Sequence, residues 1–84
     1  MTVLAVFRSR SQTLDFVSRL SRNGVNVQTI NTPKEANVGC GLSAKFSSSN
    51  LVQAKFILKN VRYSAFVGFY TYENLYGVSI FRQI

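Results

Sequence analysis

The sequence contains no histidine, a single cysteine and only three acidic residues, Asp15, Glu35 and Glu73. Histidine is the commonest general base and metal ligand near neutral pH, and structural zinc sites use four nitrogen, sulfur or oxygen ligands. This shortage argues against a hydrolase and against a metalloenzyme. We therefore expect a protein that is not an enzyme, with no catalytic residue, no metal and no cofactor.

The single cysteine and the short apolar runs also bear on where the protein works. Cys40 cannot form an intrachain disulfide, whereas small secreted domains usually depend on several. The apolar run at residues 3–7 is too short for a signal-peptide core or a membrane span, and no later run is longer. We expect a cytoplasmic protein that makes no membrane contact.

The chain is strongly basic, with 10 lysines and arginines and a net charge of +7. Such a balance favours anionic partners. The basic residues are scattered along the sequence, however, and most of them are expected on the solvent-exposed faces of helices. The sequence therefore predicts weak, salt-sensitive and non-specific binding of polyanions.

The 84 residues are enough for one domain, residues 1–84, and they include no linker and no low-complexity tract. Five strands are predicted from apolar runs and alternation, at residues 3–7, 25–30, 42–46, 63–70 and 75–81. Two helices are predicted at residues 11–23 and 50–60. The order predicts an α+β fold, a ferredoxin-like two-layer sandwich (βαββαβ plus a C-terminal strand) with both helices on one face.

Local signals support these boundaries. Ser9 and Gln12 fit an S-x-x-Q capping box, and Gly24 stands at the stop position of the same helix. Glu73-Asn74 is the predicted turn between the last two strands. The expected core consists of the apolar residues Val3, Ala5, Val17, Leu20, Val27, Ala44, Leu51, Ala54 and Leu58.

The segment at residues 31–41 carries unusual local detail. Thr32 and Glu35 fit a T-x-x-E capping box with Pro33 at the first helical position, which predicts a short helical turn. Cys40 lies between Gly39 and Gly41, which remove Cβ obstruction and let backbone amides approach a sulfur or an anion.

Two lysines flank this cysteine in the sequence, Lys34 before it and Lys45 after it, and they are candidate anion-binding residues. Positive charge stabilises a thiolate, so the pattern favours a presented, reactive thiol. On composition alone, a small buried hydrophobe at the start of a strand fits Cys40 equally well.

The letters TPKE, followed by GCGLSAKF, resemble the pattern T-P-R-E, a short polar spacer and then C-G-L-A-L-R-F. That pattern is typical of a family of small bacterial domains of unknown function named as selenium/sulfur (Se/S) carrier-like proteins. The flanks are also similar, with Gly24-Val25 before the motif and Leu51 and Ala54 after it. The resemblance covers residues 2–62.

The resemblance implies that Cys40 accepts sulfur or selenium as a persulfide-type adduct. It also implies a framing loop around this thiol, formed by Thr32, Pro33, Lys34, Glu35, Gly39 and Gly41. The partners would be sulfur or selenium donor and acceptor proteins. Two departures stand out: Lys34 replaces the more usual arginine, and the aromatic tail from Tyr63 onward does not fit the end of the family pattern.

Two readings from other classes stay open. An RNA-recognition domain shares the βαββαβ order, but the first and third strands here offer only Phe7 and Phe46, and the pattern K/R-G-F/Y-G/A-F-V-x-F/Y is absent. A regulatory or assembly domain could instead use the aromatic tail to meet another chain, for example in a homodimer.

Overall fold

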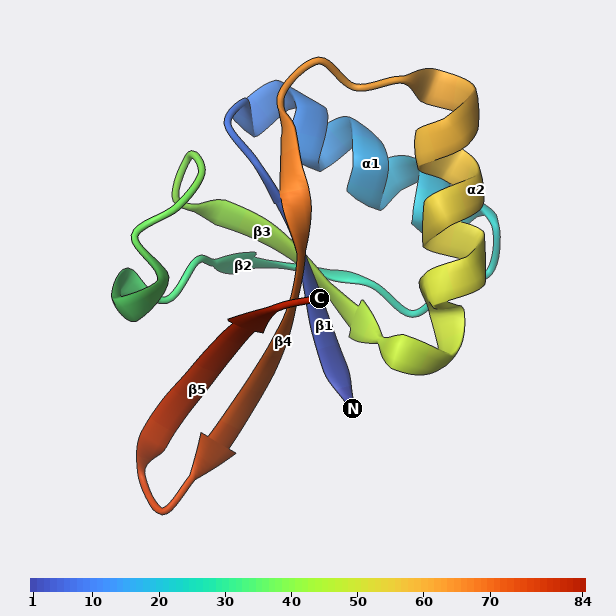
Figure 1. The fold of residues 1–84 in the computed structure, drawn as a ribbon. Helices are drawn as coiled ribbons and strands as arrows, with labels where there is room; N and C mark the ends of the chain where they lie inside the picture. Colours follow the sequence, from blue (N-terminus) through green and yellow to red (C-terminus); the bar gives the residue numbers. More distant parts are fainter.

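A computed structural model describes residues 1–84, except for the side chain of Glu35. The elements in chain order are β1 (Thr2–Phe7), α1 (Arg10–Arg22), β2 (Gln28–Asn31), the 3₁₀ turn η1 (Lys34–Ala36), β3 (Leu42–Ser47), the 3₁₀ turn η2 (Ser48–Asn50), α2 (Leu51–Val61), β4 (Phe66–Leu75) and β5 (Val78–Gln83). The strands form one antiparallel sheet in the order β2-β3-β1-β4-β5, and both helices lie on one side of it (Figure 1). The predicted α+β class is confirmed. Neither helix in the described chain is long and apolar enough to cross a membrane.

Only one half of the capping box predicted at the start of α1 is formed. The hydroxyl of Ser9 accepts a hydrogen bond from the backbone N–H of Gln12 at 3.2 Å, which confirms Ser9 as the N-cap. The Gln12 side chain does not return to Ser9 but accepts from the N–H of Ala65 at 2.9 Å and donates to Ser64 at 3.0 Å. The first turn of α1 is therefore tied to the segment that leads into β4.

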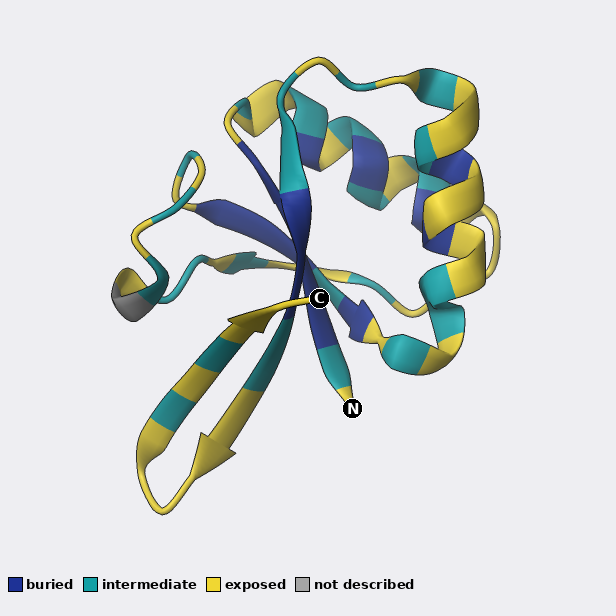
Figure 2. Ribbon diagram, in the orientation of Figure 1, coloured by how far each residue is buried: buried dark blue, intermediate teal, exposed yellow. Residues whose placement is uncertain are grey.

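The core is centred on β1. Its residues Val3, Ala5 and Phe7 face the helices, where they pack with Phe16 and Leu20 of α1. The predicted core is confirmed: five of its members are buried and four are partly buried against them, namely Val17, Val27, Leu51 and Leu58. Figure 2 shows the buried residues along β1 and on the inner faces of the helices.

The face of the sheet away from the helices is covered too. Leu4 and Val6 of β1 are fully buried there beside Tyr70. The cover comes from partly buried apolar residues of the 32–41 loop, of β2 and of the last two strands, namely Ile30, Val38, Val67, Tyr72 and Phe81. The 32–41 loop is therefore packed onto the sheet.

Three sequence predictions need correction. The second strand begins at Gln28, because Val25 is buried and its N–H bonds the carbonyl of Leu20 at the end of α1. The alternation of Leu42, Ala44 and Phe46 with Ser43 and Lys45 predicts a solvent-exposed face on β3, but Ser43 is buried, and its hydroxyl hydrogen-bonds that of Thr32 in the covering loop. The last turn falls at Tyr76-Gly77 instead of Glu73-Asn74.

Candidate functional site

Cys40 lies in the 32–41 loop, beside the end of β1 and the first turn of α1. Its backbone N–H donates to the carbonyl oxygen of Phe7 at 2.9 Å, and the N–H of Thr32 donates to the carbonyl of Gly41 at 2.8 Å. The second bond closes the base of the loop, and the first fixes the cysteine to the last residue of β1. The Cys40 side chain is partly buried.

The two glycines beside Cys40 have different roles. Both have positive φ, +76° at Gly39 and +86° at Gly41. A Cβ on Gly39 would stand 2.5 Å from Cγ1 of Val6 and 2.8 Å from the carbonyl oxygen of Phe7, whereas nothing lies within 4 Å of a Cβ on Gly41. Gly39 therefore permits the close approach of the loop to β1, and Gly41 only needs to turn the chain.

The sulfur of Cys40 points to the first turn of α1. It lies 3.7 Å from the hydroxyl oxygen of Thr13, and the thiol donates to the carbonyl oxygen of Leu42 at 3.6 Å. Thr13 is fully buried, and its hydroxyl donates to the carbonyl of Ser9 at 3.1 Å. The sulfur therefore lies beside the first turn of α1, within reach of one hydroxyl group and one carbonyl oxygen.

Sequence reasoning did not find Thr13. A threonine in the first turn of a helix gives no spacing signal for a residue 27 positions further along the chain, since the contact depends on the tertiary fold. The two cations that flank this turn, Arg8 and Arg10, were also not singled out, and both are exposed.

The structure brings most of the predicted framing residues together. They line a shallow hollow of about 340 Å³ on the 32–41 loop, formed by Thr32, Pro33, Lys34, Asn37, Val38, Gly39 and Gly41. The side chain of Glu35 lies outside the described part of the structure.

The predicted capping box around η1 is wrong for Thr32. The helical turn itself is present, but its N-cap is Pro33, and none of the described side chains caps it. The hydroxyl of Thr32 bonds Ser43 instead. Ser43 is paired with Ile30 in the antiparallel register, so Thr32, two residues further on, lies diagonally opposite Ser43 on the same face of the sheet. A long-range partner has replaced the local one.

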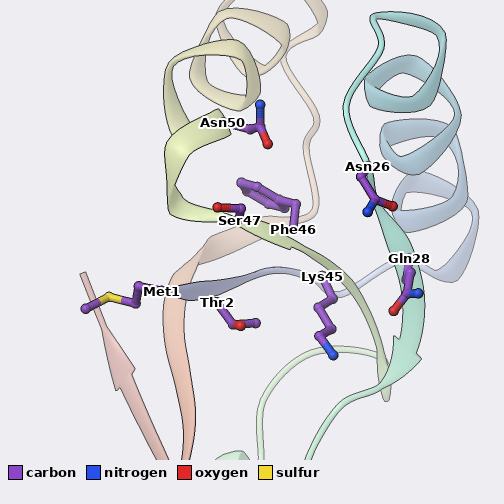
Figure 3. A pocket seen from close by; sticks show the side chains of 8 residues that line it. All are labelled: Met1, Thr2, Asn26, Gln28, Lys45, Phe46, Ser47 and Asn50. Atoms are coloured by element: carbon purple, nitrogen blue, oxygen red, sulfur yellow. The ribbon is translucent and has the colours of Figure 1, made fainter.

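The two predicted anion-binding lysines do not share a site. Lys45 lines a separate hollow of about 330 Å³ at the other end of β3, with Met1, Thr2, Asn26, Gln28, Phe46, Ser47 and Asn50 (Figure 3). Its neighbours across the sheet are Leu4 of β1 and Gln28 of β2. Lys34 alone lies with the framing loop.

A second polar cluster joins α1 to the segment before β4. One carboxylate oxygen of Asp15 accepts from the hydroxyl of Tyr63 at 2.6 Å and from Nε of Arg19 at 2.8 Å. The Tyr63 hydroxyl, followed by Arg19, lowers the pKa of Asp15. Burial, followed by the hydrogen bond to Asp15, raises the pKa of Tyr63. Among the described side chains no three potential metal ligands gather at one point.

Comparisons with known proteins identify one family. Neither the curated proteins nor the solved structures contain a significant match to the chain. The family described as "Putative Se/S carrier protein-like" matches residues 2–67, which include β1, Cys40 with its loop, and α2. Most of the β4–β5 hairpin lies beyond the match. Because the matched region is more than half of the chain, the protein belongs to this Se/S carrier-like family.

Proposed function

We propose that the protein carries sulfur or selenium on Cys40, which accepts the atom from a donor protein and passes it to an acceptor protein. One observation carries this proposal: the only thiol of the chain lies in the family-matched region, partly exposed, beside the first turn of α1. A thiol that only filled the core would be expected among the fully buried residues.

The transfer needs no oxidant and no bound cofactor. The thiolate of Cys40 attacks the outer sulfur of a donor persulfide, a new S–S bond forms at Cys40, the S–S bond of the donor breaks, and the donor leaves as a thiolate. Delivery to an acceptor thiolate is the same reaction in reverse. A selenium atom in the outer position would be transferred by the same exchange of bonds.

The residues around Cys40 fit a site that holds a sulfur or selenium atom better than a site that catalyses its repeated transfer. The Thr13 hydroxyl lies 3.7 Å from the sulfur, and the carbonyl oxygen of Leu42 accepts a hydrogen bond from the thiol at 3.6 Å. The chain has no histidine, so a general base would have to come from the partner. We therefore infer a carrier that is not itself an enzyme and that works in a reducing cytoplasm with a donor and an acceptor protein.

We also infer that the fold is the ferredoxin-like sandwich with one added strand. The strands β2-β3-β1-β4 are antiparallel, β1 and β4 occupy neighbouring positions, and both helices cover the same face. These features match two interleaved split β-α-β units, and β5 extends the sheet beyond β4.

The RNA-binding alternative finds no support in the positions of the aromatic rings. Phe7 and Phe46, the rings of the two central strands, both belong to the helix-side core and are 0% and 3% exposed. An RNA-recognition domain needs rings on the open face of these strands, where bases can stack. On the face of the sheet away from the helices, β1 and β3 of this protein carry no aromatic ring.

Mass spectrometry tests the carrier proposal. The protein is isolated without reducing agent, exposed to glutathione persulfide, and digested. We expect a mass increase of one sulfur atom on the Cys40 peptide of the folded protein, removed by dithiothreitol and absent from Cys40→Ser. If the folded protein takes up no sulfur while the same chain in urea does, the fold shields the thiol and the proposal fails.

A further inference from the structure

A third hollow lies between the two helices, away from Cys40. We call it the helix groove, a hollow of about 330 Å³ lined by Arg19, Arg22, Asn23, Phe56, Ile57, Asn60 and Val61. It lies at the carboxyl ends of both helices, where α1 passes behind α2 in Figure 1. No step proposed for Cys40 uses these residues.

The groove has an apolar side that meets solvent. Phe56 is 66% exposed, and Val52, one turn earlier on the same face of α2, is 78% exposed. Ile57 and Val61 lie beside Phe56 in the groove and pack against the core. A scattered exposed hydrophobic residue is ordinary, but here Phe56 lines a hollow with an apolar floor, and Val52 extends the exposed apolar surface by one turn of α2.

The rim of the groove is positively charged. Two arginines line the groove, and among the described side chains the structure forms one ion pair, between Arg19 and Asp15. Arg22 therefore has no carboxylate partner there, and neither have Lys55 and Lys59, which precede the lining residues Phe56 and Asn60 on α2. All three are exposed. An anionic segment would find several cations and no unpaired acid within this part of the two helices.

The rim is also held in place. The side-chain amide of Asn23 donates to the carbonyl of Arg19 at 2.7 Å, and that of Asn60 donates to the carbonyl of Phe56 at 2.8 Å. Because both amides are bound to their own helices, these two side chains have less conformational entropy to lose when a ligand enters the groove.

We propose that the helix groove docks an acidic segment of a partner protein that inserts an apolar side chain beside Phe56. The concave shape favours a protruding side chain over a flat lipid surface, and a single exposed ring with an aliphatic floor offers no stacking platform for successive bases. Thr13 beside Cys40 and Arg22 in the groove are nine residues apart on α1, or about 13 Å at 1.5 Å per residue. A partner bound here would leave the thiol uncovered.

A peptide titration followed by NMR tests this proposal. The probe is a short peptide of repeating Glu-Glu-Leu-Leu units added to ¹⁵N-labelled protein, and poly-glutamate, phosphatidylserine vesicles and poly-uridine are titrated in parallel. We expect peptide-induced shifts confined to residues 19–23 and 52–61, with weaker binding of poly-glutamate, which has no apolar anchor.

Variants decide which contacts carry the binding. We expect Phe56→Ser and Arg22→Glu each to weaken peptide binding about tenfold, the equivalent of about 1.4 kcal/mol. Both residues are exposed, so the fold should persist, and circular dichroism checks this. Three control variants should bind the peptide as the parent does. Lys34→Glu makes the same charge change outside the groove, Leu14→Ser removes an exposed apolar residue from α1, and Cys40→Ser removes the thiol.

Three results would overturn the proposal. Equal weakening by Lys34→Glu would mean that the overall charge alone attracts the peptide. Tighter binding of the vesicles or of poly-uridine at the same residues would assign the groove to a membrane or to a nucleic acid. Unchanged binding by Phe56→Ser and Arg22→Glu would place the site elsewhere, and none of these results bears on sulfur uptake by Cys40.

Discussion

At the scale of single residues, one carboxylate oxygen of Asp15 joins Tyr63, before β4, to Arg19 on α1. The Tyr63 hydroxyl is the main reason that the pKa of Asp15 lies below its ordinary value of about 3.9. A carboxyl whose pKa is lower in the folded state contributes stability above its unfolded pKa, and this contribution is lost as the pH falls.

Tyr63→Phe should therefore weaken the acid sensitivity of the fold. The variant is expected to lose part of its stability at neutral pH, and its free energy of unfolding should fall less steeply than that of the parent below about pH 4, because the pKa of Asp15 returns toward its ordinary value. Urea titrations at neutral and acid pH measure both quantities. Tyr76→Phe, at a fully exposed tyrosine, is the control, and parallel pH profiles for the parent and Tyr63→Phe would contradict the assignment.

The sequence was informative about Cys40 but not about its surroundings. The glycines, Pro33 and Lys34 are local neighbours, so a short motif could identify them, and the structure places them around one hollow. Thr13 and the carbonyl of Phe7 reach Cys40 only through the packing of β1 and α1 against the loop. No local pattern encodes such contacts, and for the same reason the bond between Thr32 and Ser43 was missed.

At the scale of elements, the 32–41 loop is held against β1 at Gly39. Gly39→Ala should destabilise the protein by about 1–3 kcal/mol, because an L-residue is strained at this φ and the new Cβ would meet the backbone oxygen of Phe7. Gly41→Ala has a similar φ but open space, and should cost about 1 kcal/mol. Chemical denaturation of both variants measures the difference, and equal losses would mean that the loop does not press on β1.

The two helices and the strands β1 and β3 could be predicted because capping residues and apolar periodicity are local, whereas β2 begins three residues later than predicted. The last hairpin could not be placed to the residue. Its turn has positive φ at Tyr76 (52°) and Gly77 (77°). Turns of this geometry usually have asparagine or aspartate before the glycine. A tyrosine in that position carries no such signal, so the polar pair Glu73-Asn74 was taken for the turn.

At the scale of the whole molecule, the β4–β5 hairpin projects beyond the rest of the sheet (Figures 1 and 2). The pairing of β1 with β4 ends at Tyr72, and past this point Leu75, Tyr76 and Val78 are exposed by 47%, 102% and 61%. β5 is also an edge strand of the sheet. Exposed apolar edges favour pairing with another strand.

We therefore predict that the protein self-associates through β5. Sedimentation velocity should show a dimer that dissociates on dilution, and Val78→Lys should shift it to the monomer because a charged edge opposes strand pairing. Val52→Lys, the same change at an exposed site on α2, should leave the dimer intact. A parent protein that stays monomeric at all concentrations would refute this role of the hairpin.

The central claim is that the whole fold presents one thiol for reaction with a partner, and the rate of alkylation of Cys40 tests it most directly. Iodoacetamide is added at neutral pH to the folded protein and to the same protein in urea, and modification is followed by intact mass. Because Cys40 is partly exposed, we predict no strong protection by the fold, so that the folded protein reacts at a rate similar to that of the unfolded chain. Strong protection of the thiol in the folded protein, relieved by urea, would show instead that Cys40 is a residue of the core and would contradict the carrier account.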